Sequence, residues 1–532
     1  MAHSLLFRRL VLALQTARND YLKAQGLPEP LPLTSQQLWS RRRFMKTGVA
    51  ASIGGLAGPM LSYPAAASVR QGNARIAIIG AGIAGLNAAH QLQKAGISAT
   101  VYEARPRTGG RMLSTIKDGL VYDIGAELIN TDHADMLALT REFRIDLFNK
   151  LTNAAKSPYP KEIYLFDGVR YSEAQLAEDL AAIAAQITED SQFLDHDWDF
   201  YAPLFDQLSV ADYLNQHSDK LPNRFIFQLL QAAIRTEYGV ELDESSALQL
   251  LFILPVVQGD KVNLLSYSNE VFAVKEGSGQ ITDALARSLS GQIQLNTVLQ
   301  RIDQQGNEYR LTFSNRTEAA ADIVIVTLPF PALRRVTLNA NLPNLFRRFV
   351  NECGLGANEK LMAGFSKRFW HQADGFTGAA WSNEGYAEVW DESQRQPDRV
   401  NGALNFFLGG NQARQDARNP NTRLLGNQFI AALDQFIPGA LDSASNTFIR
   451  SGWAQSPYTQ GGYANFKPGQ LTTFAEYFWV DSQNPNARQE VAFDNLIFAG
   501  EHLSDAYYGF MNGGAETGRL AAAHALSKIT IS

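Results

Sequence analysis

The chain has 532 residues, which is too long for one ordinary hydrophobic core and indicates two or three domains. Apolar residues make up 45% of it and charged residues 19%, and no apolar run of roughly eighteen residues predicts a membrane span. The net charge of -6 includes no basic block in the predicted mature part, so we expect a small-molecule ligand rather than nucleic acid or an anionic membrane. The single cysteine, Cys353, excludes an internal disulfide, and we interpret it as a core or loop residue.

Residues 1–67 are predicted to be an export leader. Ser40–Lys46 (SRRRFMK) matches the twin-arginine pattern, a weakly apolar stretch follows over 47–61, and Ala65–Ala67 offers a small-residue cleavage site. This order predicts a periplasmic or secreted protein that the twin-arginine machinery exports in folded form. Export after folding suits a chain that must acquire a large cofactor in the cytoplasm.

A dinucleotide-binding motif follows the leader. The apolar run 75–79 predicts a strand, Gly80-x-Gly82-x-x-Gly85 predicts a turn, and 86–94 predicts a helix. Gly80 permits the tight turn, Gly82 lets the backbone approach a pyrophosphate, and Gly85 lets the helix pack closely on the strand. The order of strand, turn and helix therefore predicts dinucleotide binding.

The residues after this motif favour FAD over a nicotinamide dinucleotide. The next predicted strand, 99–103, ends in Glu103, where an acceptor for a ribose hydroxyl is needed. The turn Gly109–Arg111 then offers backbone amides and a guanidinium to phosphate oxygens. A further strand, 120–124, runs into Gly125-Ala126, which suits a planar ring lying over the backbone or is an ordinary turn.

The C-terminal block repeats the pattern of a strand followed by a helix. The segment 496–501 reads as a buried parallel strand that stops at Gly500 and Glu501, and a helix is predicted over 515–526. The free amides at a helix N-terminus would face the anionic oxygens of a flavin, and Glu501 would accept a ribityl hydroxyl.

These three blocks together resemble the flavin amine oxidase family, which includes monoamine, polyamine and L-amino acid oxidases. The likeness spans roughly 74–527, and the segment 123–133 is more similar to bacterial L-amino acid oxidases than to monoamine oxidases. It implies an α/β fold: a discontinuous Rossmann-like FAD-binding domain, an inserted α+β substrate domain and a helical subdomain. The expected segments are 74–145, 271–340 and 485–532 for the FAD-binding domain, 146–270 for the mainly helical subdomain and 341–484 for the substrate-binding domain.

The resemblance also implies which residues hold FAD. Glu103 is expected to bind the adenosine ribose, Arg111 the phosphate side and the backbone of Val298 the adenine. The other implied FAD contacts are Gly80, Gly82, Ala84, Gly85, Ala104, Gly110, Gly125, Ala126, Glu127, Gly500, Glu501 and Met511. Tyr463 stands where monoamine oxidases carry the cysteine that attaches flavin, so the FAD is expected to be non-covalent; no metal is expected.

For catalysis, the resemblance implies removal of a hydride equivalent from the carbon that bears a primary amine. Water would hydrolyse the resulting imine, and oxygen would reoxidise the flavin and give hydrogen peroxide. Lys360 falls where the family's lysine holds a water against flavin N5, the alternative being a surface lysine at a strand start. Phe510 matches one wall of the aromatic cage around the amine, and further candidates for the cage or the core are Trp453, Tyr458, Tyr463 and Tyr508.

The substrate class stays open between three possibilities. An L-amino acid needs a cation for its carboxylate, but this chain has Glu127-Leu128 where animal L-amino acid oxidases carry the arginine, so Arg235 or another arginine would have to substitute. Glu127 instead favours a cationic group in the substrate, unless it is a solvated or capping acid. The favoured function is oxidation of L-amino acids, including basic ones such as arginine or lysine. The alternatives are an amine or polyamine oxidase and a flavin-dependent desaturase or structural flavoprotein, and a homo-oligomer is expected from the resemblance alone.

Overall fold

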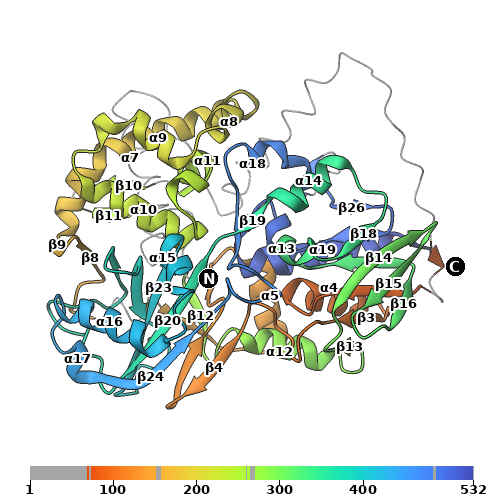
Figure 1. Ribbon diagram of the computed structural model, residues 1–532, viewed down its shortest axis with the longest axis horizontal. Coiled ribbons are helices and arrows are strands. Elements are labelled where there is room, and N and C mark those ends of the chain that lie inside the picture. The colour runs from red at the N-terminus through yellow and green to blue at the C-terminus, as the bar shows by residue number, and fades with distance from the viewer. Residues whose placement is uncertain are drawn as a thin grey trace.

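The structure is a computed structural model that describes residues 69–70, 74–150, 152, 157–253, 255–258, 261–263, 270–482, 484 and 487–530. The predicted leader, with its twin-arginine motif and cleavage site, lies outside the described residues. The described chain forms two lobes that lie side by side (Figure 1). A six-stranded sheet organises the first lobe, and a seven-stranded sheet with a group of helices forms the second.

The six-stranded sheet has the order β13-β3-β2-β17-β27-β26. All neighbouring pairs are parallel except β26 with β27, which is antiparallel. The four central strands are short apolar runs with almost every residue buried, as parallel strands covered by helices require. The predicted strands near 75–79, 99–103 and 496–501 are therefore present. The bounds are β2 Ile76–Ile79, β3 Ala99–Tyr102, β13 Ile293–Gln294, β17 Ile323–Val326, β26 Ala492–Phe493 and β27 Leu496–Phe498.

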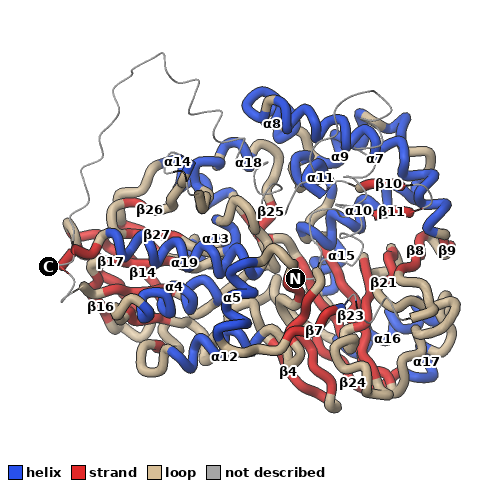
Figure 2. The backbone as a smooth tube through the Cα atoms, turned by 180° about the vertical axis from the view of Figure 1, so that it is seen from behind, coloured by secondary structure: helices blue, strands red, loops and turns tan. Residues whose placement is uncertain are grey.

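Two long helices of the first lobe, α4 (Ile83–Lys94) and α19 (Met511–Ser527), lie side by side (Figure 2). Glycines permit this close packing. A Cβ at Gly85 would lie 2.0 Å from the carbonyl oxygen of Gly80, and one at Gly518 would lie 2.2 Å from that of Ala84. Gly85 therefore brings α4 against the end of β2, as the motif predicts, and Gly518 brings α19 against α4.

Smaller elements complete this part of the molecule. A four-stranded sheet has the order β16-β15-β14-β18, and a three-stranded sheet the order β6-β12-β7. Their strands are β6 Leu128–Ile129, β7 Leu147–Asn149, β12 Phe272–Val274, β14 Leu299–Gln305, β15 Glu308–Phe313, β16 Glu318–Ala321 and β18 Thr337–Asn339. Paired short strands are β1 Val69–Arg70 with β28 Ile529–Thr530, β4 Ser114–Lys117 with β5 Leu120–Asp123, and β19 Gly354–Leu355 with β25 Ala464–Asn465. The helices are α5 Ala134–Glu142, α12 Gly279–Ser288, α13 Phe330–Leu333, α14 Asn344–Glu352 and α18 Gln470–Thr473.

The seven-stranded sheet of the second lobe has the order β24-β20-β23-β22-β21-β8-β9. Every residue of its two long central strands, β20 and β23, is buried. The strands are β8 Glu162–Phe166, β9 Val169–Tyr171, β20 Asn358–Phe365, β21 Ala379–Ser382, β22 Glu388–Asp391, β23 Gly402–Gly409 and β24 Ala444–Arg450, and the accompanying helices are α15 Asn411–Asp416, α16 Thr422–Asp434 and α17 Ala440–Ser443. Because β8 and β9 come from the range 146–270, this sheet is not confined to the predicted substrate segment 341–484.

The remaining part of 146–270 forms the helices of the second lobe. The helices are α7 Glu173–His196, α8 Trp198–Asp206, α9 Val210–Gln216, α10 Arg224–Tyr238 and α11 Ala247–Ile253, followed by the hairpin of β10 Val256–Gln258 and β11 Lys261–Asn263. Within the described ranges, no helix has the length and apolar character needed to cross a membrane. The predicted fold class, a discontinuous Rossmann-like α/β domain with an inserted α+β part and a helical part, is confirmed.

Candidate functional site

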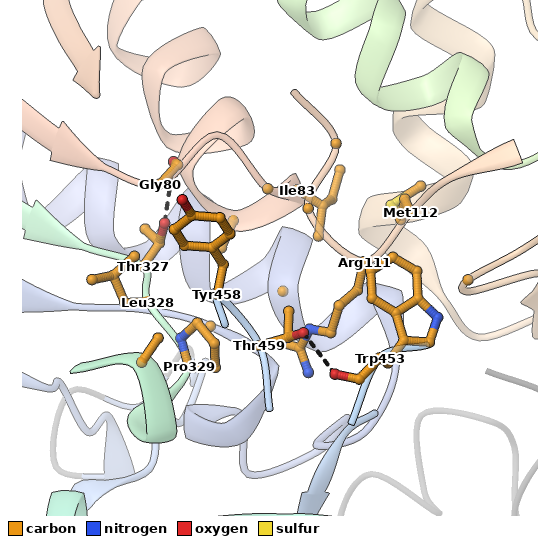
Figure 3. Close-up of a pocket in the computed structure, with 18 of the residues that line it drawn as sticks. Gly80, Ile83, Arg111, Met112, Thr327, Leu328, Pro329, Trp453, Tyr458 and Thr459 are labelled. Carbon is orange, nitrogen blue, oxygen red and sulfur yellow. Dashed lines mark hydrogen bonds between the residues drawn. The ribbon is translucent and has the colours of Figure 1, made fainter. Parts of the chain in front are cut away.

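A cavity extends from the turn after β2 to the middle of the seven-stranded sheet. Its first end lies at the carboxyl ends of parallel strands, where ligands of such sheets bind. Figure 3 shows Gly80, Thr327 and Tyr458 at one end, with Arg111 and Trp453 at the other. The predicted residues that line the cavity are Gly80, Gly82, Ala84, Glu103, Ala104, Gly110, Arg111, Gly125, Ala126, Val298, Lys360, Trp453, Tyr458, Tyr463, Gly500, Glu501, Phe510 and Met511. Gly85, Glu127 and Tyr508 do not line it.

Glu103 links the first glycine turn to the strand that follows it. Its Oε2 accepts a hydrogen bond from the amide of Ala81 at 2.8 Å, and its Oε1 accepts one from the amide of Arg105 at 2.9 Å. These bonds hold the carboxylate at the edge of the cavity and leave each oxygen with a further lone pair. That geometry fits an acceptor for ribose hydroxyls.

Two helix N-termini face the same cavity without a protein cap. The first turns of α4 and α19 have neither a capping side chain nor an acidic residue. At the start of α4 the backbones of Gly82 and Gly110 approach each other closely, since a Cβ on Gly110 would lie only 3.1 Å from the Cα of Gly82. Neither glycine has a side chain that could cover the backbone amides there. Uncapped amides with partial positive charge beside a glycine-lined gap fit a pyrophosphate and the anionic oxygens of a flavin.

Arg111 and Glu501 connect the two halves of this cradle. The guanidinium of Arg111 donates to Oε1 of Glu501 and to the carbonyl oxygen of Gly462, both at 2.7 Å. The amide of Gly509 donates to Oε2 of Glu501 at 2.7 Å. The carboxylate is thereby fixed between α19 and the turn that contains Arg111.

Gly125 is required by packing at the flavin end. A Cβ at this position would lie 1.9 Å from the carbonyl oxygen of Arg111 and 3.1 Å from the ring of Trp453. Trp453 is held there, because its Nε1 donates to the carbonyl oxygen of Ile124 at 3.0 Å. The absence of a side chain at Gly125 therefore allows the Arg111 turn and Trp453 to pack closely against it, beside Ala126, which also lines the cavity.

Lys360 is buried in β20 and is 3% exposed, so the alternative of a surface lysine is excluded. Its ammonium donates to Oε2 of Glu127 at 2.8 Å and to the carbonyl oxygen of Asp123 at 2.9 Å. An ammonium has three N–H donors, and among the described residues these two bonds are its hydrogen bonds. The third donor is left for a group in the cavity that Lys360 lines.

Arg395 completes a buried ionic network behind Lys360. Its guanidinium donates to Asp123 at 2.5 Å, to Glu127 at 3.0 Å and to Glu392 at 3.4 Å. Burial lowers the pKa of Lys360, but the charges of Glu127, Glu392 and Asp123 outweigh burial and hold that pKa above its ordinary value. Burial raises the pKa of Glu127, but Lys360 and Arg395 more than reverse that effect and lower it. The network therefore keeps Lys360 cationic and Glu127 anionic.

The network corrects the role of Glu127 as a direct contact of the substrate or of FAD. Each of its oxygens already accepts a hydrogen bond from a protein cation, and its side chain does not line the cavity. Arg235, which was considered for a substrate carboxylate, is likewise engaged, because its guanidinium donates to Glu241 at 2.8 Å.

The predicted aromatic cage divides into two groups. Trp453, Tyr463 and Phe510 line the cavity, and Tyr463 is anchored by a hydrogen bond from its hydroxyl to the carbonyl oxygen of Thr236. Tyr458 lies at the dinucleotide end, where the guanidinium of Arg105 is 5.2 Å from its ring, so it is not part of a cage near Lys360. Tyr508 packs on Phe466 at 5.0 Å, in the core.

Three residues of this region were not identified from the sequence: Arg395, Phe407 and Glu388. Phe407 lines the cavity and is the cross-strand partner of Lys360. The pattern of β22, which carries Glu388 in a strand where every residue is buried, contained a signal, since a charged residue in a buried strand requires an explanation. Which face of the sheet it occupies depends on the register, which the sequence does not show.

The residues present fit FAD bound without a covalent link. The cavity combines a glycine-lined gap, two uncapped helix N-termini and two fixed carboxylates. Tyr463 occupies the place of the attaching cysteine, and Cys353, the one cysteine of the sequence, is buried and does not line the cavity.

Comparison with known proteins agrees with this geometry. The family model for flavin containing amine oxidoreductases matches residues 83–526. An L-amino acid dehydrogenase of Synechocystis sp. is 24% identical over 87% of this chain and 97% of its own length. Amine oxidase B of Sus scrofa is 24% identical over 85% of this chain and 87% of its own length.

Solved structures share the fold. A putrescine oxidase bound to putrescine superposes with a TM-score of 0.67 at 22% identity, covering 85% of this chain and 99% of its own. Cyclohexylamine oxidase from Brevibacterium oxydans gives 0.70 at 20% identity, covering 86% and 99%. The chain therefore belongs to the family of flavin-containing amine oxidoreductases, and FAD is its cofactor.

Proposed function

We propose that the protein removes a hydride equivalent from the carbon that bears a primary amine, and that oxygen is the final electron acceptor, giving hydrogen peroxide. The bound FAD supplies the redox chemistry. The observation that carries the proposal is Lys360, which is buried, cationic and at the cavity with one donor left over. A fixed positive charge in a site of low dielectric stabilises negative charge that develops as oxygen is reduced.

The aromatic side chains hold the amine. Trp453, Tyr463 and Phe407 present large apolar surfaces at the inner part of the cavity, and each is at most 8% exposed. Such walls exclude water and favour the neutral amine, which is the form that can lose a hydride. Positioning of this kind needs no acid-base dyad.

The charges around the inner cavity favour an amine without a carboxylate. Three nearby arginines are already paired with protein carboxylates: Arg111 with Glu501, Arg235 with Glu241, and Arg395 with Asp123 and Glu127. A paired guanidinium has no free fork for a substrate carboxylate. We therefore place an amine or diamine first.

A basic L-amino acid is the second candidate, and Lys150 favours it. This lysine is 5% exposed, and charge interactions join it to Glu127 and Glu388. Burial lowers its pKa, so a substrate carboxylate would regain the protonated form. Lys150 does not line the cavity, so it would favour an amino acid substrate through its charge and not as a direct contact.

Anaerobic flavin spectra test these proposals. The purified holoenzyme is mixed without oxygen with putrescine, spermidine, L-lysine, L-arginine or L-phenylalanine. Bleaching by the polyamines alone supports the first candidate, whereas bleaching by basic amino acids supports the second and directs mutation to Lys150. No bleaching by any of them contradicts amine oxidation and favours a desaturase.

We also propose that residues 1–67 direct export of the folded protein. Replacing Arg41 and Arg42 by lysine should leave FAD-loaded protein in the cytoplasm. Export that is unchanged by this substitution would contradict the twin-arginine route.

A further inference from the structure

One row of side chains crosses the seven-stranded sheet at the inner end of the cavity. Lys360 on β20 pairs with Phe407 on β23, and Phe407 pairs with Glu388 on β22. Residues directly opposite one another on neighbouring strands point to the same face of a sheet. Glu388 therefore points to the face on which Lys360 and Phe407 line the cavity.

The carboxyl group of Glu388 is buried and unpartnered in the described part of the chain. Its side chain is 1% exposed, and both carboxyl oxygens are buried without a hydrogen-bond partner among the described residues. An unpartnered buried polar group costs roughly 1–3 kcal/mol, so its presence beside the cavity requires an explanation, and a bound cation would supply the missing partner. Glu388 does not itself line the cavity, but its cross-strand neighbour Phe407 does, and so does Tyr463, whose hydroxyl interacts with the charge of Glu388.

We propose that Glu388 determines specificity by receiving a second cationic group of the substrate, at the far end from the carbon that is oxidised. The inference rests on the proposed function and extends it to the substrate class: diamines, polyamines or amino acids with a basic side chain. Adjacent strands are about 4.8 Å apart, so Glu388 lies roughly 10 Å from Lys360 along the sheet. That separation suits two nitrogens joined by a short alkyl chain, one at the reacting end and one at Glu388.

The charges that surround Glu388 make it a receptor for a cation. Burial raises its pKa well above the ordinary value, and the carboxylates of Glu162, Glu237 and Glu127 raise it further, while Lys150 opposes them. Burial and these charges therefore favour the neutral carboxyl group while no cation is bound. A bound ammonium or guanidinium favours the ionised form, so binding of a dicationic substrate should release about one proton from Glu388, in addition to the proton that the reacting amine loses when it binds in its neutral form.

The test compares Glu388→Gln with the parent holoenzyme on substrates that differ in one charge. Putrescine and butylamine have the same carbon chain, and anaerobic flavin reduction gives a dissociation constant and a limiting rate for each. We expect Glu388→Gln to raise the dissociation constant of putrescine by at least about 30-fold and to leave its limiting rate similar. The dissociation constant of butylamine should stay the same or fall. Glu352→Gln is the control, because it removes a carboxylate from an exposed ion pair with Arg348, and it should change the binding of neither amine.

Calorimetric titration of putrescine in two buffers of different ionisation enthalpy measures the released proton independently of turnover. A release that is smaller by about one proton in Glu388→Gln than in the parent supports the proposal. Equal putrescine binding by both proteins, or an unchanged ratio of putrescine to butylamine affinity, overturns it even if amines bleach the flavin. If no amine bleaches the flavin, the proposed function fails, and the titration still decides whether Glu388 binds a cation. Glu388→Leu repeats the measurement should Glu388→Gln not fold.

Discussion

The ammonium of Lys360 and the carboxylate of Glu127 lie 2.8 Å apart, and each side chain is only 3% exposed. Lys360 lies on a strand of the second lobe, whereas Glu127 follows the glycine turn that packs against Arg111. The pair therefore joins the sheet that walls the cavity to the turn beside the cofactor. Breaking it affects both the position and the charge of the lysine.

Replacement of Lys360 by methionine should slow reoxidation of the reduced flavin by oxygen, on the order of 100-fold, because the fixed positive charge at the cavity is lost. FAD should remain bound, since Lys360 makes no contact with the residues that surround the dinucleotide end of the cavity. Stopped-flow mixing of the reduced holoenzyme with oxygen measures the rate. Lys275→Met, at a side chain that is 51% exposed, is the control. Reoxidation at the parent rate would remove Lys360 from the site.

Glu127→Gln should move the alkaline limit of reoxidation to lower pH. Glu127 is the charge that most raises the pKa of Lys360, so without it the lysine loses its proton earlier as pH rises. The variant should also unfold at a lower temperature, because breaking a buried charge network typically costs about 3–5 kcal/mol. Reoxidation rates across neutral to alkaline pH provide the measurement, with Glu142→Gln, at a surface ion pair, as the control. An unshifted profile would mean that Glu127 does not set the charge of Lys360.

Gly85→Ala should abolish FAD binding. The added methyl would lie 2.0 Å from the carbonyl oxygen of Gly80 and would displace α4 from the turn that faces the pyrophosphate. Gly354→Ala is the matched control, because a Cβ there meets no atom within 4 Å. The ratio of flavin to protein absorbance after purification reports the outcome. A Gly85→Ala variant with full FAD content would contradict this account of the motif.

The stability of the holoenzyme should fall in acid through His502, whose ring packs on Phe330 at 4.4 Å. Burial lowers its pKa from 6.5 to about 4, so between these values the unfolded chain binds a proton that the folded protein does not. The contribution of His502 is therefore present above pH 6.5 and is lost as pH falls toward 4. His502→Phe should reduce the acid loss by up to about 3 kcal/mol. Thermal unfolding at the two ends of this pH range measures the loss of stability, and the exposed His196→Phe is the control. An equal loss of stability in the parent and in His502→Phe would contradict this account.

Denaturation should release all of the FAD. Tyr463 stands at the attaching position and donates its hydroxyl to Thr236, so no thiol meets the flavin there. Acid precipitation followed by a spectrum of the supernatant gives the result. Yellow colour retained in the pellet would show a covalent link at another residue.

The sequence predicts the dinucleotide end well because its signals are local. Gly80, Gly82 and Gly85 lie in one short segment that joins β2 to α4, and apolar runs of a few residues predict this strand and this helix. Close packing at Gly85 and the position of Glu103 at the cavity edge agree with those expectations. A local motif needs no information on how distant segments meet.

The charged centre could not be predicted in the same way. Lys360 and Arg395 both bind Glu127, which lies 233 and 268 residues away from them in the sequence. Seen alone, Glu127 suggested a contact with a cationic substrate, but two protein cations occupy it. Glu388 was overlooked because only the register of β22 against β23 shows that it shares a face with Lys360.

The order of strands in the first lobe has a consequence for when the cofactor can be acquired. β2 pairs with β17, so Ile79 has its partner only once Val326 is present, and β17 in turn pairs with β27, whose residues follow much later in the sequence. Gly500 and Gly514, which also line the cavity, follow β27 in the sequence, so they are synthesised after β2 and β17. FAD binding therefore needs segments that lie far apart in the sequence, and a chain truncated before β27 should not retain FAD.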